Sequence, residues 1–149
     1  GEEDVSSEAD YSATSVTTPE PTSITDSYSL LKALGRHPRF SNENTKVMMI
    51  ANKMEKIEEG QILYQKLNTV VTRYLKMEIS YLGTVPQDVQ LEKAVMQQMP
   101  VSLQNENAKS AKAYERIAAK LMYPGEGEPA VKKRGMAAFF AHFIGNTPQ

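Results

Sequence analysis

The sequence predicts an α/β fold: a partial doubly wound parallel sheet of about three strands with flanking helices, followed by a C-terminal amphipathic helix. Three observations support this prediction. Short β-prone runs alternate with longer helical patterns, which is typical of βαβ units. The run 45–53 is apolar without alternation, as expected of a strand that is covered on both faces. A separate apolar stripe then follows a Pro- and Gly-rich stretch near the end of the chain.

The elements are expected in the following order. Strands are predicted at 11–18, 45–53 and 78–85, and helices at about 24–35, 58–76 and 89–98, with a last helix that ends near Met122. Thr22 or Ser23 is the expected cap of the first helix, and Asn105 or Asn107 that of the last. The 3.6-residue period places Val70 and Tyr74 on the buried face of the second helix, and Tyr114 and Leu121 on that of the last.

These elements divide the chain into four parts. Residues 1–10 are an acidic lead-in or the cut end of a longer chain, and 11–122 form part of one domain. Residues 123–134 are the predicted linker, and 135–145 the amphipathic helix. Three strands make a small sheet of this type, so we expect the first half of the domain to lie upstream of Gly1.

Composition excludes several function classes. The 17 basic and 18 acidic residues of the 149 nearly cancel, which argues against a nucleic-acid binder. Cysteine is absent and there are two histidines, so neither a disulfide framework nor a metal site is predicted. No apolar run approaches the roughly 18 residues of a spanning helix, so any membrane contact should be peripheral. A cytoplasmic location fits this composition.

Catalytic motifs are also missing. The sequence contains no G-x-x-x-x-G-K-[ST] loop to hold phosphates, no nucleophile elbow and no HExxH pair. We therefore predict no catalytic residue in this chain.

Polar residues follow two of the predicted strands. Asn52 and Lys53 end the second strand, and Pro86-Gln87-Asp88 follows the third. Ligands of open α/β sheets bind outside the carboxyl ends of the strands. An amide beside a proline ring can read a flat heterocycle, so these positions predict the base-reading half of a nucleotide site. The alternative is that Asn52 only turns the chain.

The end of the chain combines a basic cluster with an apolar stripe. Such a helix, after a linker, is typical of attachment to an anionic membrane surface. The alternative is a terminal helix that docks on its own domain or on a partner. The predicted membrane-binding residues are Lys132, Lys133, Arg134, Met136, Phe139, Phe140, Phe143 and Ile144.

Four segments together resemble the C-terminal half of a MinD/ParA-type P-loop ATPase, and within that group the flagellar placement and number regulators called FlhG or YlxH. They are VTTPEPTSITDSYSLLKAL (16–34), VMMIANK (47–53), YLGTVPQD (81–88) and KKRGMAAFFAHFIG (132–145). The resemblance covers nearly all of residues 10–145. Its most specific part is TTPEPTSITD, a proline-bounded turn before a helix.

The resemblance implies site residues for this chain. Asn52 would contact adenine with Lys53 beside it, Pro86 and Asp88 would close the adenine pocket, and Glu20 and Asp26 would lie near a dimer face.

The resemblance also implies an activity and partners for the complete protein. That protein would bind ATP and Mg²⁺, form a homodimer around ATP, attach peripherally to the inner face of the cell membrane and detach on hydrolysis. Its implied partners are the SRP-type GTPase FlhF and components of the flagellar switch.

The Walker A loop, the catalytic Asp and the switch regions of such ATPases have no counterpart here. We therefore expect this chain to hold no nucleotide tightly and to hydrolyse no ATP on its own. A different hypothesis is a membrane-attached interaction module that uses no nucleotide, and a third is a small Rossmann-like domain docked to a partner enzyme.

Overall fold

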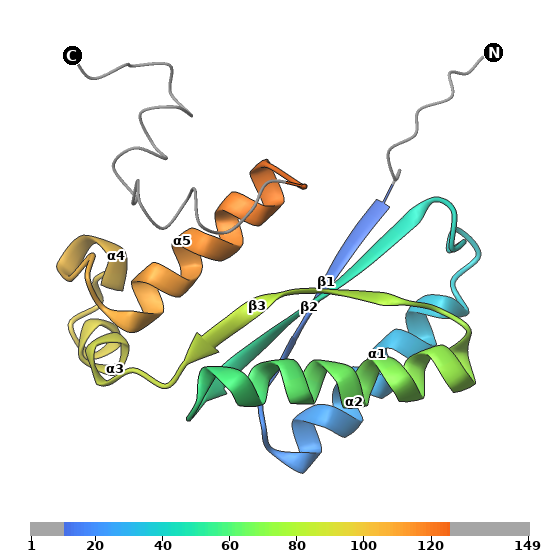
Figure 1. Cartoon of the computed structure of the whole chain (residues 1–149), viewed down its shortest axis with the longest axis horizontal. Coiled ribbons are helices and arrows are strands. Elements are labelled where there is room, and N and C mark those ends of the chain that lie inside the picture. Colours follow the sequence, from blue (N-terminus) through green and yellow to red (C-terminus); the bar gives the residue numbers. More distant parts are fainter. Residues whose placement is uncertain (1–10, 126–149) are drawn as a thin grey trace.

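The computed structural model describes residues 11–125 and shows a three-stranded parallel sheet with helices on both faces (Figure 1). The elements are β1 (Tyr11–Thr17), α1 (Pro21–Gly35), β2 (Thr45–Met54), α2 (Ile57–Leu75), β3 (Ile79–Pro86), α3 (Val89–Met96), α4 (Val101–Gln104) and α5 (Lys109–Met122). The strand order is β1-β2-β3, and both pairings are parallel. The predicted α/β fold is therefore confirmed.

The central strand β2 is buried on both faces, as its unbroken apolar run predicts. Met49 packs in the core beneath α1 and α2, where it is fully buried beside Leu67 and Val71. Met48 points to the other face and packs with Ile117 of α5. In Figure 1, α1 and α2 lie on one side of the sheet and α5 on the other. The face of β1 toward α5 stays open, and Val16 is 55% exposed there.

Helices α1 and α2 both begin without a side-chain cap. The predicted cap at Thr22 or Ser23 is wrong, because α1 starts at Pro21 and its N-cap residue is Glu20. The Ser23 hydroxyl instead accepts a hydrogen bond from the Thr18 backbone N–H at 2.9 Å. Proline suits the first helical position because its missing N–H would have no helical partner there.

Two helix faces are narrower than predicted. The buried stripe of α2 consists of Gly60, Leu63, Leu67 and Val71. Val70 and Tyr74 are 40% and 62% exposed. On α5, Tyr114 and Leu121 are also exposed. A sheet of three strands touches only a narrow arc of each helix, so residues at the margins of the periodic pattern stay in solvent.

Helix α2 packs very closely against β3 at Gly60. An added Cβ on Gly60 would lie 1.9 Å from the Thr84 Oγ1, so only glycine allows this contact. None of the described helices is long and apolar enough to cross a membrane.

Candidate functional site

The candidate site lies at the edge where the three parallel strands end. The strand register sets Thr17 of β1 opposite Ala51 of β2, so β1, β2 and β3 finish side by side. Asn52 pairs with Val85, and Met54 pairs with Pro86. The Gln87 backbone N–H then donates to the Met54 carbonyl at 2.8 Å. Asn52 and Pro86 are therefore neighbours across one strand pair, as the sequence predicts.

Lys53 forms a bulge between these two pairings. The register skips it, and its backbone has φ 60°, in the left-handed region that non-glycine residues rarely adopt. A bulge re-aims the chain at the end of a strand, and such strained positions cluster at ligand sites. The Lys53 side chain is exposed and the Asn52 side chain is half-buried.

Asp88 is buried and fully engaged in holding two helices. One carboxylate oxygen, Oδ1, accepts the Gln90 N–H at 2.9 Å and so caps α3. The other, Oδ2, accepts the Ser110 N–H at 2.8 Å and the Ser110 hydroxyl at 2.7 Å. Ala108, the N-cap residue of α5, offers no side-chain cap. Asp88 thus caps both α3 and α5, where a negative charge is favourable.

This arrangement corrects the predicted cap of the last helix. Neither Asn105 nor Asn107 caps α5, because the Asn105 side chain accepts the Asn107 N–H in a local turn just after α4. The cap comes instead from Asp88, 22 positions before Ser110. No local spacing rule could have identified a partner so distant in sequence.

The hydrogen bonds also set the protonation of Asp88. Burial alone would raise the pKa of this carboxyl, but the bonds from Ser110 and Gln90 and the charge of Lys109 outweigh it. The pKa therefore lies below its ordinary value of 3.8, and Asp88 is ionised at neutral pH.

Glu20 and Asp26 lie near the end of β1 and are exposed. Glu20 is the N-cap residue of α1, where its carboxylate accepts a hydrogen bond from the Thr18 hydroxyl. Asp26 lies in the next turn of α1. Both side chains are thus open to solvent at the site end of the sheet.

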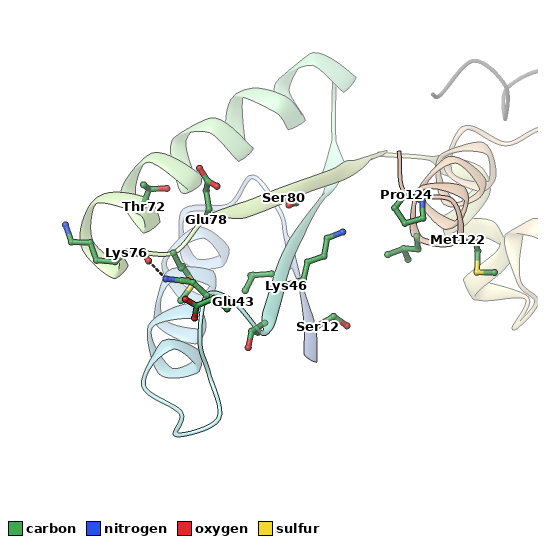
Figure 2. A pocket seen from close by; sticks show the side chains of 14 residues that line it. Ser12, Glu43, Lys46, Thr72, Lys76, Glu78, Ser80, Met122 and Pro124 are labelled. Atoms are coloured by element: carbon green, nitrogen blue, oxygen red, sulfur yellow. Dashed lines mark hydrogen bonds between the residues drawn. The ribbon is translucent and has the colours of Figure 1, made fainter. Parts of the chain in front are cut away.

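Two hollows in residues 11–125 lie away from this edge. The larger, of about 1200 Å³, surrounds the amino ends of the strands, where the Asn42 side chain donates to the Lys76 carbonyl at 3.0 Å (Figure 2). The smaller lies between the start of α2, β3 and α5. Asn52, Lys53, Pro86 and Asp88 line neither hollow.

The predicted membrane-binding residues, from Lys132 to Ile144, lie outside the described residues, as do the acidic lead-in 1–10 and most of the linker. Within the described part, no three His, Cys, Asp or Glu side chains are grouped so as to hold a metal ion.

Comparison with known proteins gives curated relatives and solved structures of the same fold. The chain is 33% identical over 130 residues to the antiactivator FleN of Pseudomonas aeruginosa, and 27% identical over 131 residues to the flagellum site-determining protein YlxH of Helicobacter pylori. Each match covers 87% of this chain. The MinD cell division protein of Aquifex aeolicus shares the fold, with a TM-score of 0.53, 24% identity and coverage of 78% of this chain. No protein-family model matches.

The chain is therefore similar over most of its length to two flagellar or antiactivator relatives, FleN and YlxH, and it shares the fold of MinD. The resemblance read from its four segments is therefore confirmed. The chain spans 44% of the length of FleN and 42% of YlxH, and 44% of the Aquifex MinD chain. It thus represents less than half the length of these proteins.

Proposed function

We propose that this chain supplies the base-reading and membrane-attaching part of an FlhG-type ATPase that regulates flagellar placement or number. The relatives FleN and YlxH are named as an antiactivator and a flagellum site-determining protein, which supports the regulatory role. The observation that carries the nucleotide part is the juxtaposition of Asn52 and Pro86 at the carboxyl edge of the sheet.

In this proposal, Asn52 and Pro86 read the adenine base. The half-buried Asn52 amide would offer a donor and an acceptor to the base edge, and the Pro86 ring, which is buried at the end of β3, would support this edge from inside. Asp88 has an indirect role in this proposal. Its carboxylate oxygens accept hydrogen bonds from the Gln90 and Ser110 backbone N–H groups, and these bonds fix the turn that follows Pro86. The half-buried amide of Asn52 is thus the feature that supports base reading at this edge.

The phosphates and Mg²⁺ would be held by the phosphate-binding loop of the complete protein. When bound, they would supply the hydrolysable anhydride and its charge compensation. Glu20 and Asp26, exposed at the same end of the sheet, would lie near the ATP-dependent homodimer face. FlhF and flagellar switch components are the proposed partners.

The terminal segment would attach the protein to the inner face of the cell membrane. Each basic residue near an anionic surface contributes about 1 kcal/mol, and the aromatic stripe from Met136 to Ile144 adds apolar burial. Dimerisation doubles the number of anchors, so attachment would follow ATP binding through avidity. A Phe140→Glu variant should lose binding to phosphatidylglycerol vesicles, and unchanged binding would contradict the membrane role.

The nucleotide role is tested in the complete protein with Asn52→Ala. We expect ATP to bind about tenfold more weakly, and discrimination between ATP and GTP to fall, because the amide contacts only the base. Asn42→Ala is the matched control, since Asn42 lies at the opposite end of the sheet. Equal losses in both variants, or none in Asn52→Ala, would refute base reading at this edge and favour the nucleotide-independent module.

A further inference from the structure

The charges of residues 11–125 are divided between the two ends of the sheet. Most of the acids lie at the carboxyl end of the strands, on the turns and helices around the candidate site. Helices α1, α2 and α5 run back from there and finish toward the amino end (Figure 1). At that end, among the described residues, Glu43 and Glu78 are outnumbered by six exposed basic side chains, which we call the basic end: Lys32, Arg36, Arg39, Lys46, Arg73 and Lys76.

The loop between α1 and β2 holds part of this charge in a fixed place. No acid occurs from residue 27 to residue 42. The Arg39 N–H donates to the His37 Nδ1 at 3.1 Å, and the Asn42 side chain joins the loop to the Lys76 carbonyl at 3.0 Å. Phe40 packs against the core beneath the loop. The loop therefore has a defined shape and presents its two arginines to solvent.

Helix dipoles explain only part of the basic end. Lys32 and Arg73 lie in the last turns of α1 and α2, where a cation is favourable. That effect falls off within the last turn, so it gives no reason for Arg39 in the loop or for Lys46 in β2. Exposed charges of one sign repel one another. Their collection at one end of a chain with almost no net charge indicates an anionic partner.

Exposed apolar side chains lie beside the basic end. Leu121 and Met122, where α5 finishes, are 50% and 44% exposed, and they line the larger hollow together with Lys46. In Figure 2, Lys46 points from β2 toward the side of the hollow where Met122 and Pro124 lie. Nucleic acids attract basic side chains through their phosphates, which offer nothing to these apolar groups. The headgroup region of an anionic membrane accommodates cations and apolar side chains together.

We propose that the amino end of the sheet is a second contact with an anionic membrane surface. The arginines of the loop and Lys46 face the phospholipid headgroups, and Leu121 and Met122 reach toward the acyl chains. The candidate site lies at the opposite end of the sheet and so faces away from the membrane. This proposal rests on the membrane role proposed above, because a few surface cations strengthen an anchored protein but hold a free one only weakly.

Sedimentation of the full chain with vesicles of phosphatidylglycerol and phosphatidylcholine tests the basic end. Removing both loop arginines, by Arg36→Ala with Arg39→Ala, should weaken binding by about fivefold for each arginine. The matched control is Lys93→Ala with Lys112→Ala, which removes the same charge from exposed positions on α3 and α5. The control should bind within about twofold of the parent, because salt screens charges that are distant from the surface. Circular dichroism confirms that each variant is folded.

Salt gives a second measurement on the same proteins. The difference in affinity between the parent and the arginine variant should shrink as the salt concentration rises. Equal binding by the arginine variant and the lysine control would overturn the proposal, as would a difference that does not change with salt. Retardation of duplex DNA that depends on the two arginines, with unchanged vesicle binding, would overturn it in favour of a nucleic acid.

Phe140→Glu, measured in parallel, reports the terminal segment separately. If this variant binds vesicles as the parent does, the membrane role proposed above fails. If it loses binding while the arginine variant binds as the parent does, only the basic end is refuted. The failures of the two proposals are thus distinguishable.

Discussion

Asp88→Asn should destabilise this protein more than any surface substitution, because one carboxylate caps two helices. Asparagine retains a single acceptor oxygen, so it can serve either Gln90 or Ser110, but not both. Ser110 is fully buried, and leaving its N–H unsatisfied costs about 1–3 kcal/mol. Losing the charge-assisted character of the remaining bond adds about 1 kcal/mol. We expect a total loss of about 2–4 kcal/mol in the free energy of unfolding.

Urea unfolding followed by far-ultraviolet circular dichroism measures this loss. Asp26→Asn makes the same chemical change on an exposed side chain of α1 and should stay within about 0.5 kcal/mol of the parent. If Asp88→Asn were as stable as Asp26→Asn, the double cap would not contribute to stability, and the reasoning from the hydrogen bonds to Ser110 would fail.

The same carboxylate predicts a pH dependence. Hydrogen bonds hold the pKa of Asp88 below its ordinary value of 3.8, so the unfolded state binds this proton more readily than the folded state. The stability that Asp88 contributes is fully present above pH 3.8 and is lost as the pH falls through the lower, folded-state pKa. The difference in the free energy of unfolding between the parent and Asp88→Asn should therefore become smaller in acid. A difference in the free energy of unfolding that stays constant down to pH 2 would contradict this account.

Three further predictions follow from close contacts. Gly60→Ala should lower the free energy of unfolding by about 1–3 kcal/mol, because the added methyl group would push α2 away from β3. Thr84→Ala removes the atoms that the methyl group would meet, so it should recover part of that loss in a double-mutant cycle measured by urea unfolding. Asn68→Ala should lower the free energy of unfolding by about 1–3 kcal/mol, because the Asn68 side-chain oxygen accepts the outward N–H of Ile79 at 3.0 Å. Aggregates that elute earlier on size-exclusion chromatography would show that the β3 edge had opened. Lys53→Gly should raise stability by about 1 kcal/mol by relieving its φ of 60°, and a thermal melt that moves down would indicate that the lysine side chain supports the bulge.

Much of the fold could be read from local patterns. The continuous apolar run of β2 predicted a strand buried on both faces, and Met48 and Met49 indeed lie in cores on opposite sides of the sheet. Alternating strand and helix signals predicted the parallel pairing, because parallel strands need a crossover between them. The short helix α4 was missed, since four residues after Pro100 show no period.

The candidate site was predictable in part for the same reason. Once the strands are parallel, the residues after β2 and β3 must share an edge, and Asn52 and Pro86 do. The role of Asp88 was not predictable, because its partner Ser110 is 22 positions away and nothing in that interval fixes how the chain returns.

The sequence alone determined which residues form strands and helices, which apolar runs enter the core, and which strand ends carry polar groups. These properties depend on side-chain chemistry and on periods of two or 3.6 residues. Only the tertiary structure decided that Asp88 caps two helices, that Lys53 bulges between Asn52 and Met54, and that Glu115 of α5 is buried. Each of these depends on how elements distant in sequence pack together, and local spacing does not encode that packing.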